Sequence, residues 1–221
     1  MFEALPRLAV LEASGVAYDR LIVPEDLSSF HLETLELVGV ARERLLPFTG
    51  AHLAPDELVW ASPLAPIGWP SREMIRWLRT RLGAPLDEAG APRRLYLRRR
   101  GSRRVVNERA VTAVLGERGF EVLDPDGLTF REQVAVFAGA EALVGPHGAA
   151  FSNGIFSRRL AALELYQPRH VNVSTVGVLS AAGHDHWSLV GRRVPAATRT
   201  AHHNVHVPID QLVATLDAMA L

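Results

Sequence analysis

The fold is decided by residues 94–145, which read RLYLRRRGSRRVVNERAVTAVLGERGFEVLDPDGLTFREQVAVFAGAEALVG. Apolar runs of strand length alternate here with longer segments whose apolar residues recur at helical spacing. The expected strands are 94–98, 120–123 and 142–145, and the expected helices are 107–116 and 130–138. Such an alternation predicts an α/β fold in which helices cover both sides of a parallel sheet.

The same alternation continues on both sides of this stretch. Downstream, the pattern predicts a helix after His147, a strand at 161–165, further mixed elements and a last helix at 209–219. Upstream, it predicts a helical opening followed by a strand at 19–24, a helix at 28–38, strands at 45–48 and 57–62, and a helix at 71–82. The Gly-, Pro- and Ala-rich residues 83–94 form the clearest break in composition. We therefore expect a short N-terminal α/β part at 1–83, a linker at 84–92 and a C-terminal domain at 93–221.

The composition is that of an ordinary globular protein. Of the 221 residues, 48% are hydrophobic and 22% are charged, and the formal net charge is zero. The absence of cysteine excludes disulfides, thiolate catalysis and cysteine-ligated zinc. No GxxxxGK[ST] sequence is present, so ATP hydrolysis of that kind is not expected. No apolar run approaches the roughly 20 residues of a membrane span, and the first residues lack the order of a secretory signal, so we expect a cytoplasmic protein.

The charge is unevenly distributed, because seven arginines fall within residues 93–104. Guanidinium groups match phosphate oxygens with paired hydrogen bonds. The neutral chain lacks the general basicity and interleaved aromatic residues of a nucleic-acid surface, so a small anion is the better expectation. The alternative is that most of these side chains are simply solvated.

A second candidate segment, residues 143–156, reads LVGPHGAAFSNGIF. An apolar strand that passes through Gly-Pro-His-Gly into a helix leaves free backbone amides at the helix start, and those amides suit a phosphate. His147 adds a side chain that can donate a hydrogen bond to the same anion. The alternative is a tight turn in which His147 only packs locally. The arginines after Leu97, this turn, and Glu164 with Tyr166 all follow or end expected strands, so we expect them to converge.

Nine histidines raise the alternative of a metal site. The candidates are His184, Asp185 and His186, with His202, His203 and His206 downstream. Their spacing does not match a metalloenzyme signature such as HExxH, so a histidine-rich metal hydrolase is the weakest hypothesis.

The segments YLRRRGSRRVVNE and GFEVLDPDGLTFREQVAVFAGAEALVGPHGAAFSNGIFSRRLAALEL resemble the bacterial branch of glycosyltransferase family 61. The resemblance is strongest over residues 94–167 and weaker elsewhere. The positions that match the family's pattern are Arg99, Arg104, Asn107, Glu108, His147, Gly148, Ala149, Asn153 and Glu164.

The resemblance implies a two-domain fold of the GT-B type, in which a Rossmann-like C-terminal domain binds a nucleotide-sugar and the N-terminal domain offers the acceptor. It implies that Arg99 and Arg104 neutralise the diphosphate and that the amides of Gly148 and Ala149 bind it. Asn107, His147 and Asn153 complete the implied donor site, and Glu164 would accept ribose hydroxyls. No metal or other cofactor is expected.

The implied activity is an inverting transfer of a hexose or pentose from a nucleotide-sugar to a glycan hydroxyl, in capsule, lipopolysaccharide or exopolysaccharide synthesis. The candidates for the catalytic base are His31, Asp26 and Glu33, none of which has motif support; for His31, an exposed position beside a helix start is the favoured alternative. Because the N-terminal part is short for an acceptor domain, the second hypothesis is a catalytically weak nucleotide-sugar-binding module that acts with a partner. No nucleic acid partner is expected, while peripheral membrane association and homo-oligomerisation stay open.

Overall fold

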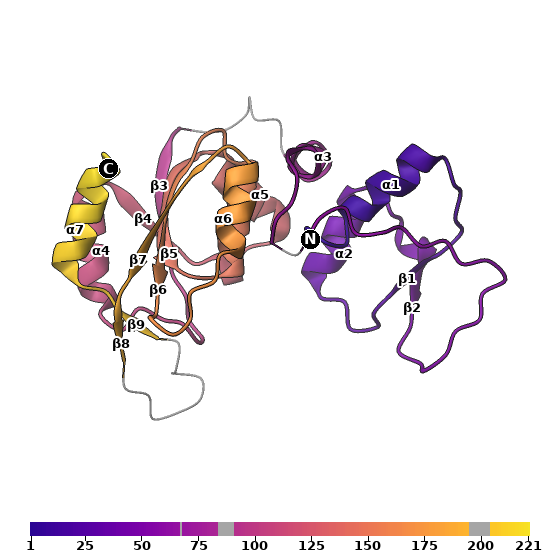
Figure 1. Ribbon diagram of the computed structural model, residues 1–221, viewed down its shortest axis with the longest axis horizontal. Helices are drawn as coiled ribbons and strands as arrows, with labels where there is room; N and C mark the ends of the chain where they lie inside the picture. The colour runs from indigo at the N-terminus through magenta and orange to yellow at the C-terminus, as the bar shows by residue number, and fades with distance from the viewer. Residues whose placement is uncertain (67, 84–90, 195–203) are drawn as a thin grey trace. The chain divides into compact units, whose positions relative to one another are not determined.

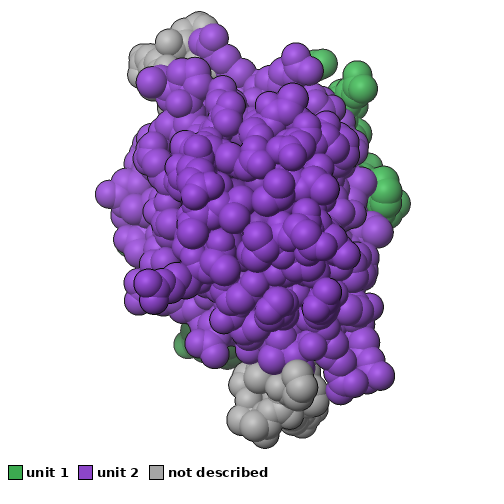
Figure 2. Space-filling model, turned by 90° about the vertical axis from the view of Figure 1, so that its left-hand side faces the viewer, with its two compact units in different colours: residues 1–83 green, residues 84–221 purple. Residues whose placement is uncertain are grey.

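The computed structural model describes residues 1–66, 68–83, 91–194 and 204–221. The chain divides into two compact units, residues 1–83 and 84–221 (Figure 2). Most of the expected linker at 84–92 lies outside the described residues, as do His202 and His203.

Unit 1 contains three α-helices, a short 3₁₀ helix and two strands among its described residues. In chain order these are α1 (Pro6–Ser14), β1 (Leu21–Val23), α2 (Ser29–Leu37), η1 (Arg42–Arg44), β2 (Leu45–Pro47) and α3 (Arg72–Leu82). The two strands pair in parallel. Helix α3 begins where the Ser71 hydroxyl accepts a hydrogen bond from the Met74 amide, and it buries Ile75 and Leu78. The expected elements of this unit are thus present, with one exception.

The exception is the strand expected at 57–62, which is wrong. These residues have no regular secondary structure, and Leu58 and Trp60 are 66% and 68% exposed. Alternating apolar residues form a strand only where a neighbouring strand satisfies their backbone groups. Among the described residues, β1 and β2 pair only with each other, so the 57–62 segment has no such neighbour.

Unit 2 is built on a five-stranded sheet in which every strand pair is parallel. Its strands are β3 (Arg93–Leu97), β4 (Phe120–Leu123), β5 (Ala140–Pro146), β6 (Ala161–Tyr166) and β7 (Asp185–Val190), in the spatial order β4-β3-β5-β6-β7. A separate antiparallel pair joins β8 (Arg192–Arg193) to β9 (Val205–His206). The parallel sheet confirms the α/β class and is consistent with a Rossmann-like domain.

Helices cover both faces of this sheet (Figure 1). Helices α4 (Glu108–Glu117) and α7 (Ile209–Ala218) lie on one side, and α5 (Phe130–Ala138) and α6 (Ser174–Ala181) lie on the other. On the first side, Val111 and Leu212 pack with Val144 and Leu163 in one buried cluster. Helix α5 begins at a capping box, in which Thr129 and Glu132 each bond the other's backbone amide.

The helix expected after His147 is a 3₁₀ helix, η4 (Ala149–Phe156), rather than an α-helix. A Cβ atom on Gly154 would lie only 2.7 Å from the Leu160 side chain and 2.9 Å from that of Leu179, so the segment packs closely against its neighbours. A glycine inside the segment also lowers its tendency to form an α-helix. The tighter helix places Phe151, Ile155 and Phe156 in the core.

The order of the strands identifies the place where this sheet reverses its direction of growth. The chain runs from β3 outward to β4 and then returns to β5 on the opposite side of β3. In open parallel sheets of this kind, ligands bind at such a reversal, outside the carboxyl ends of the strands. The loops after β3 and β5 are therefore the place to look for a site.

No helix among the described residues is both long and apolar enough to cross a membrane.

Candidate functional site

The carboxyl ends of β3 and β5 lie against each other at a glycine. A Cβ atom on Gly145 would be 2.9 Å from Leu97 Cβ and 3.0 Å from the Leu97 carbonyl oxygen. Any larger residue at position 145 would push the two strands apart. Glycine at this position therefore lets the arginine-rich loop after β3 approach the His147 turn after β5.

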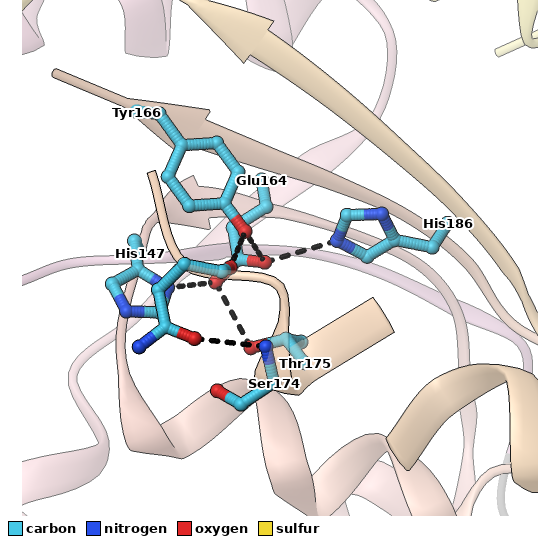
Figure 3. Close-up of polar contacts among 7 residues, drawn as sticks. His147, Glu164, Tyr166, Ser174, Thr175 and His186 are labelled. Carbon is cyan, nitrogen blue, oxygen red and sulfur yellow. Dashed lines mark hydrogen bonds and ion pairs between the residues drawn. The ribbon is translucent and has the colours of Figure 1, made fainter. Parts of the chain in front are cut away.

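A buried carboxylate lies beneath this turn and is surrounded by hydrogen-bonding side chains (Figure 3). Glu164 has no exposed surface. Its Oε1 lies 2.6 Å from His147 Nδ1 and accepts a 3.2 Å hydrogen bond from the Thr175 hydroxyl. Its Oε2 lies 2.9 Å from His186 Nε2 and accepts a 2.5 Å hydrogen bond from the Tyr166 hydroxyl. Four side chains thus hold this carboxylate, and we call these five residues the Glu164 cluster.

The alternation of side chains along β6 and β7 explains this convergence. Leu163 and Leu165 belong to the core beneath α4 and α7, so Glu164 and Tyr166 point to the opposite face of the sheet. On the next strand, Leu189 belongs to that same core, and His186 therefore lies on the face of Glu164. The ring of Tyr166 also stacks on that of His147, with centroids 5.2 Å apart.

The hydrogen bonds outweigh the effect of burial on the carboxylate. Burial by itself raises the pKa of Glu164, but the hydrogen bonds from the two histidines and Tyr166 lower that pKa to about 2. Burial, and then the hydrogen bond to Glu164, raise the pKa of the Tyr166 hydroxyl. Glu164 is therefore ionised at neutral pH, and Tyr166 keeps its proton.

An ionised carboxylate can only accept hydrogen bonds, so His147 Nδ1 and His186 Nε2 each carry a proton. This assignment leaves Nε2 as the ring nitrogen of His147 that can meet a ligand. His147 is thereby fixed in orientation.

The arginines of residues 93–104 fall into two groups. Four have a carboxylate partner: Arg93 with Glu121, Arg94 with Glu141, Arg98 with Glu108, and Arg100 with Asp124. Among the residues that the structure describes, Arg99, Arg103 and Arg104 have no such partner. Positive charges without acidic partners, at the edge where this fold binds ligands, indicate an anion site.

Arg99 reaches the His147 turn. Its Nε donates a 2.7 Å hydrogen bond to the Ser102 carbonyl oxygen, and its Nη1 would clash with a Cβ atom at position 148. A side chain at position 148 would force the guanidinium away. Gly148 precedes η4, whose first amides have no partner within the helix. Arg99, His147 and Gly148 are therefore brought together as the sequence led us to expect.

The other expected donor-binding residues are either exposed or bound to groups of the protein itself. Ala149 is exposed at the start of η4, and Arg104 is exposed while its backbone amide donates to Asn204 Oδ1 at 3.0 Å. Asn153 is 6% exposed and donates to Gln133 Oε1 at 2.7 Å. Glu164 is expected to accept ribose hydroxyls, but its carboxylate has no exposed surface. Its two oxygens instead contact the other four residues of the Glu164 cluster.

Asn107 is bound on both sides of its amide by the backbone of one residue. Its Nδ2 donates to the Val207 carbonyl oxygen at 2.8 Å, and its Oδ1 accepts from the Val207 amide at 3.0 Å. Val207 is fully buried, so both of its backbone groups depend on this side chain.

We therefore predict that Asn107→Ala lowers the free energy of unfolding by about 2 kcal/mol, because two buried backbone groups lose their partner. Urea unfolding of the variant and the natural chain measures this difference. Unchanged stability combined with lost diphosphate binding would instead assign Asn107 to the ligand.

His31 has a capping role at the start of α2. Its Nδ1 lies 3.2 Å from the Ser28 backbone nitrogen and 3.0 Å from the Ser28 hydroxyl, and this contact completes a capping box. His31 therefore lies at a helix start, which is the favoured alternative to its being a catalytic base. Its role as a base stays a prediction.

Two of the candidate metal ligands, His202 and His203, lie outside the described residues. Within the described ranges, no three His, Asp or Glu side chains are grouped so as to hold a metal ion. His186 is instead bound to Glu164, and His206 is exposed on β9.

Two residues at the site were not assigned to it from the sequence. No sequence pattern marks Thr175 as a site residue, because its contact with Glu164 depends on how α6 packs over the sheet. His186 was considered only as a metal ligand; the alternation of side chains along β7, with Leu189 on the core face, would have placed it on the face of Glu164.

Comparison with known protein families gives one match. The family model described as Glycosyltransferase 61 matches residues 1–163. This range includes all of unit 1 and the strands β3, β4 and β5, so the likeness extends well upstream of the segments in which the sequence resemblance is strongest. No curated protein matches the chain. The family match covers more than half of the chain, which therefore belongs to the glycosyltransferase 61 family.

Proposed function

We propose that this protein transfers a sugar from a nucleotide-sugar donor to a hydroxyl group of a glycan, without a metal ion, and that the donor diphosphate binds between the loops after β3 and β5. The observation that carries this proposal is the close approach of Arg99 to Gly148, beside His147, at the reversal of the strand order; among the described residues Arg99 has no carboxylate partner. Membership of the family supports a transferase.

The chemistry of such a transfer places new negative charge on the nucleotide. The acceptor oxygen forms a bond to the anomeric carbon and gives up its proton to a base, while the bond between the anomeric carbon and the β-phosphate oxygen breaks, so charge develops on the departing diphosphate. Arg99 stabilises that charge, and His147 in its doubly protonated form donates a hydrogen bond to it from Nε2 while Glu164 holds the ring through Nδ1. Fixed donors of this kind act without reorganisation during the reaction.

The finer features of the proposal rest on the resemblance of the sequence to the family's bacterial branch. We propose a GT-B arrangement, an inverting transfer of a hexose or pentose and a role in the synthesis of a surface polysaccharide. A cytoplasmic location is proposed independently of the resemblance. The short unit 1 would contribute the acceptor side.

A calorimetric titration with UDP, GDP and CDP, with and without a chelator, tests the donor site. We predict that one diphosphate binds regardless of the chelator, and that Arg99→Ala weakens it by about 1.5–3 kcal/mol, the range for a hydrogen bond to a charged group. Arg100→Ala is the matched control, because that side chain is paired with Asp124 and should leave the affinity unchanged.

The same titration separates the proposal from its rivals. Binding without transfer or donor hydrolysis would favour a nucleotide-sugar-binding module. No binding by the folded chain would refute the donor site, and binding that requires a metal would refute metal independence.

A further inference from the structure

The loop between β3 and α4 holds one arginine in an unfavourable backbone conformation. Arg103 has a φ of 64°, which is the left-handed region. Among the described residues other than glycine, only Ala220 shares a positive φ. The loop contains Gly101, which would adopt this conformation without steric cost, yet Gly101 is not the residue that adopts it.

The residues around Arg103 hold this conformation in place. On one side, Arg99 Nε donates to the Ser102 carbonyl oxygen at 2.7 Å. On the other, the Arg104 amide donates to Asn204 Oδ1 at 3.0 Å, and the Arg104 carbonyl oxygen accepts from the Val205 amide at 2.9 Å. A strained residue that its neighbours fix so closely is typical of functional sites.

The side chain of Arg103 lies within electrostatic reach of the site. Burial lowers the pKa of Arg103, the charge of Arg99 lowers it further, and the charge of Glu164 raises it. Arg103 is half-buried, and it has no carboxylate partner among the described residues. A partly buried guanidinium that lies near a second one and has no carboxylate to neutralise it is stabilised when an anion binds beside it.

We propose that Arg103 is a second diphosphate-binding arginine, which acts with Arg99 on the phosphates of the donor. This assignment rests on the proposed function and adds to it a residue that the sequence resemblance did not select. In this assignment the strained backbone conformation of Arg103 orients its guanidinium group toward the phosphates.

The test compares variants that separate charge from backbone strain. Asparagine tolerates the left-handed region and removes the charge, whereas lysine keeps the charge. We expect Arg103→Asn to weaken the binding of the preferred nucleoside diphosphate, and of inorganic pyrophosphate, by about 10- to 100-fold. Arg103→Lys should retain most of the affinity that the asparagine variant loses.

A third variant measures the strain by itself. Arg103→Gly should raise the melting temperature by about 2–4 °C while losing affinity like the asparagine variant. Ala220→Gly is the control for the thermal effect, because it relieves a positive φ of 59° at a position outside the site and should leave binding unchanged.

The outcomes distinguish this inference from the function on which it rests. If the natural chain binds a diphosphate, Arg99→Ala weakens it and Arg103→Asn does not, Arg103 is not a ligand and the donor site stands. If the natural chain binds neither a nucleoside diphosphate nor pyrophosphate, the proposed function itself is refuted. Loss of affinity in Arg103→Asn with recovery in Arg103→Lys supports the assignment.

Discussion

Replacing His147 with alanine should lower the rate of sugar transfer by about 100- to 1000-fold, which is the typical effect of removing one donor that stabilises developing negative charge. His147 is held by Glu164 through Nδ1, so its Nε2 meets the departing diphosphate in a fixed orientation. The measurement is the initial rate of transfer to a panel of test sugars, with the donor whose diphosphate binds in the titration.

Two further histidines serve as controls for this prediction. His206→Ala removes an exposed histidine of the same unit and should leave the rate unchanged. His31→Ala should cost only the stability of a helix cap, unless His31 is the catalytic base. An unchanged rate in His147→Ala would overturn its role, and a collapse of the melting temperature would instead mean that His147 only shapes the turn.

Replacing Glu164 with glutamine should lower the free energy of unfolding by about 3 kcal/mol at neutral pH. The buried carboxylate accepts four hydrogen bonds, and the amide group that replaces one oxygen cannot accept those directed at it. Urea unfolding measures the effect. Glu141→Gln is the matched control, because its ion pair with Arg94 lies at the surface and should contribute less than about 1 kcal/mol.

The pH dependence of this difference identifies its origin. The folded-state pKa of Glu164, about 2, lies below its ordinary value of 4.5, so ionisation of the carboxylate stabilises the folded protein above about pH 4.5. This contribution is lost as the pH falls from about 4.5 through about 2, and it amounts to roughly 3 kcal/mol. The stability difference between the natural chain and Glu164→Gln should therefore shrink in acid. A difference that stays constant down to pH 2.5 would show that packing, rather than charge, accounts for it.

The sequence was sufficient to predict the architecture of unit 2. Its expected strand at 120–123 and helix at 130–138 have the same limits as β4 and α5, and the expected helix at 107–116 differs from α4 by one residue at each end. Periodicity reports which side of an element is buried, and these elements are all buried on one side or both. The segments YLRRRGSRRVVNE and GPHGA were also sufficient to predict the family that the comparison shows.

The tertiary structure alone decided which side chains act together. Asn107 binds the backbone of Val207, 100 residues away, and four arginines of one run are neutralised by carboxylates from other elements. These partners follow from the order of the strands and the packing of helices on them, which no local pattern records. The strand expected at 57–62 is wrong for the same reason, since alternation describes a strand's faces and not its neighbour.

Sequence reasoning located the ligand loops because parallel strands end at one edge of a sheet, a rule that needs only the identity of the strands. The position of Glu164 could not be predicted from the identity of the strands alone. The neighbouring residues Leu163 and Leu165 had to be placed in the core first, and only then could the carboxylate be assigned to the other face of the sheet. The sequence GSRR gives no indication that Arg103 has a strained backbone conformation. A backbone conformation that its own residue disfavours is imposed by distant contacts, and only the folded chain brings those contacts together.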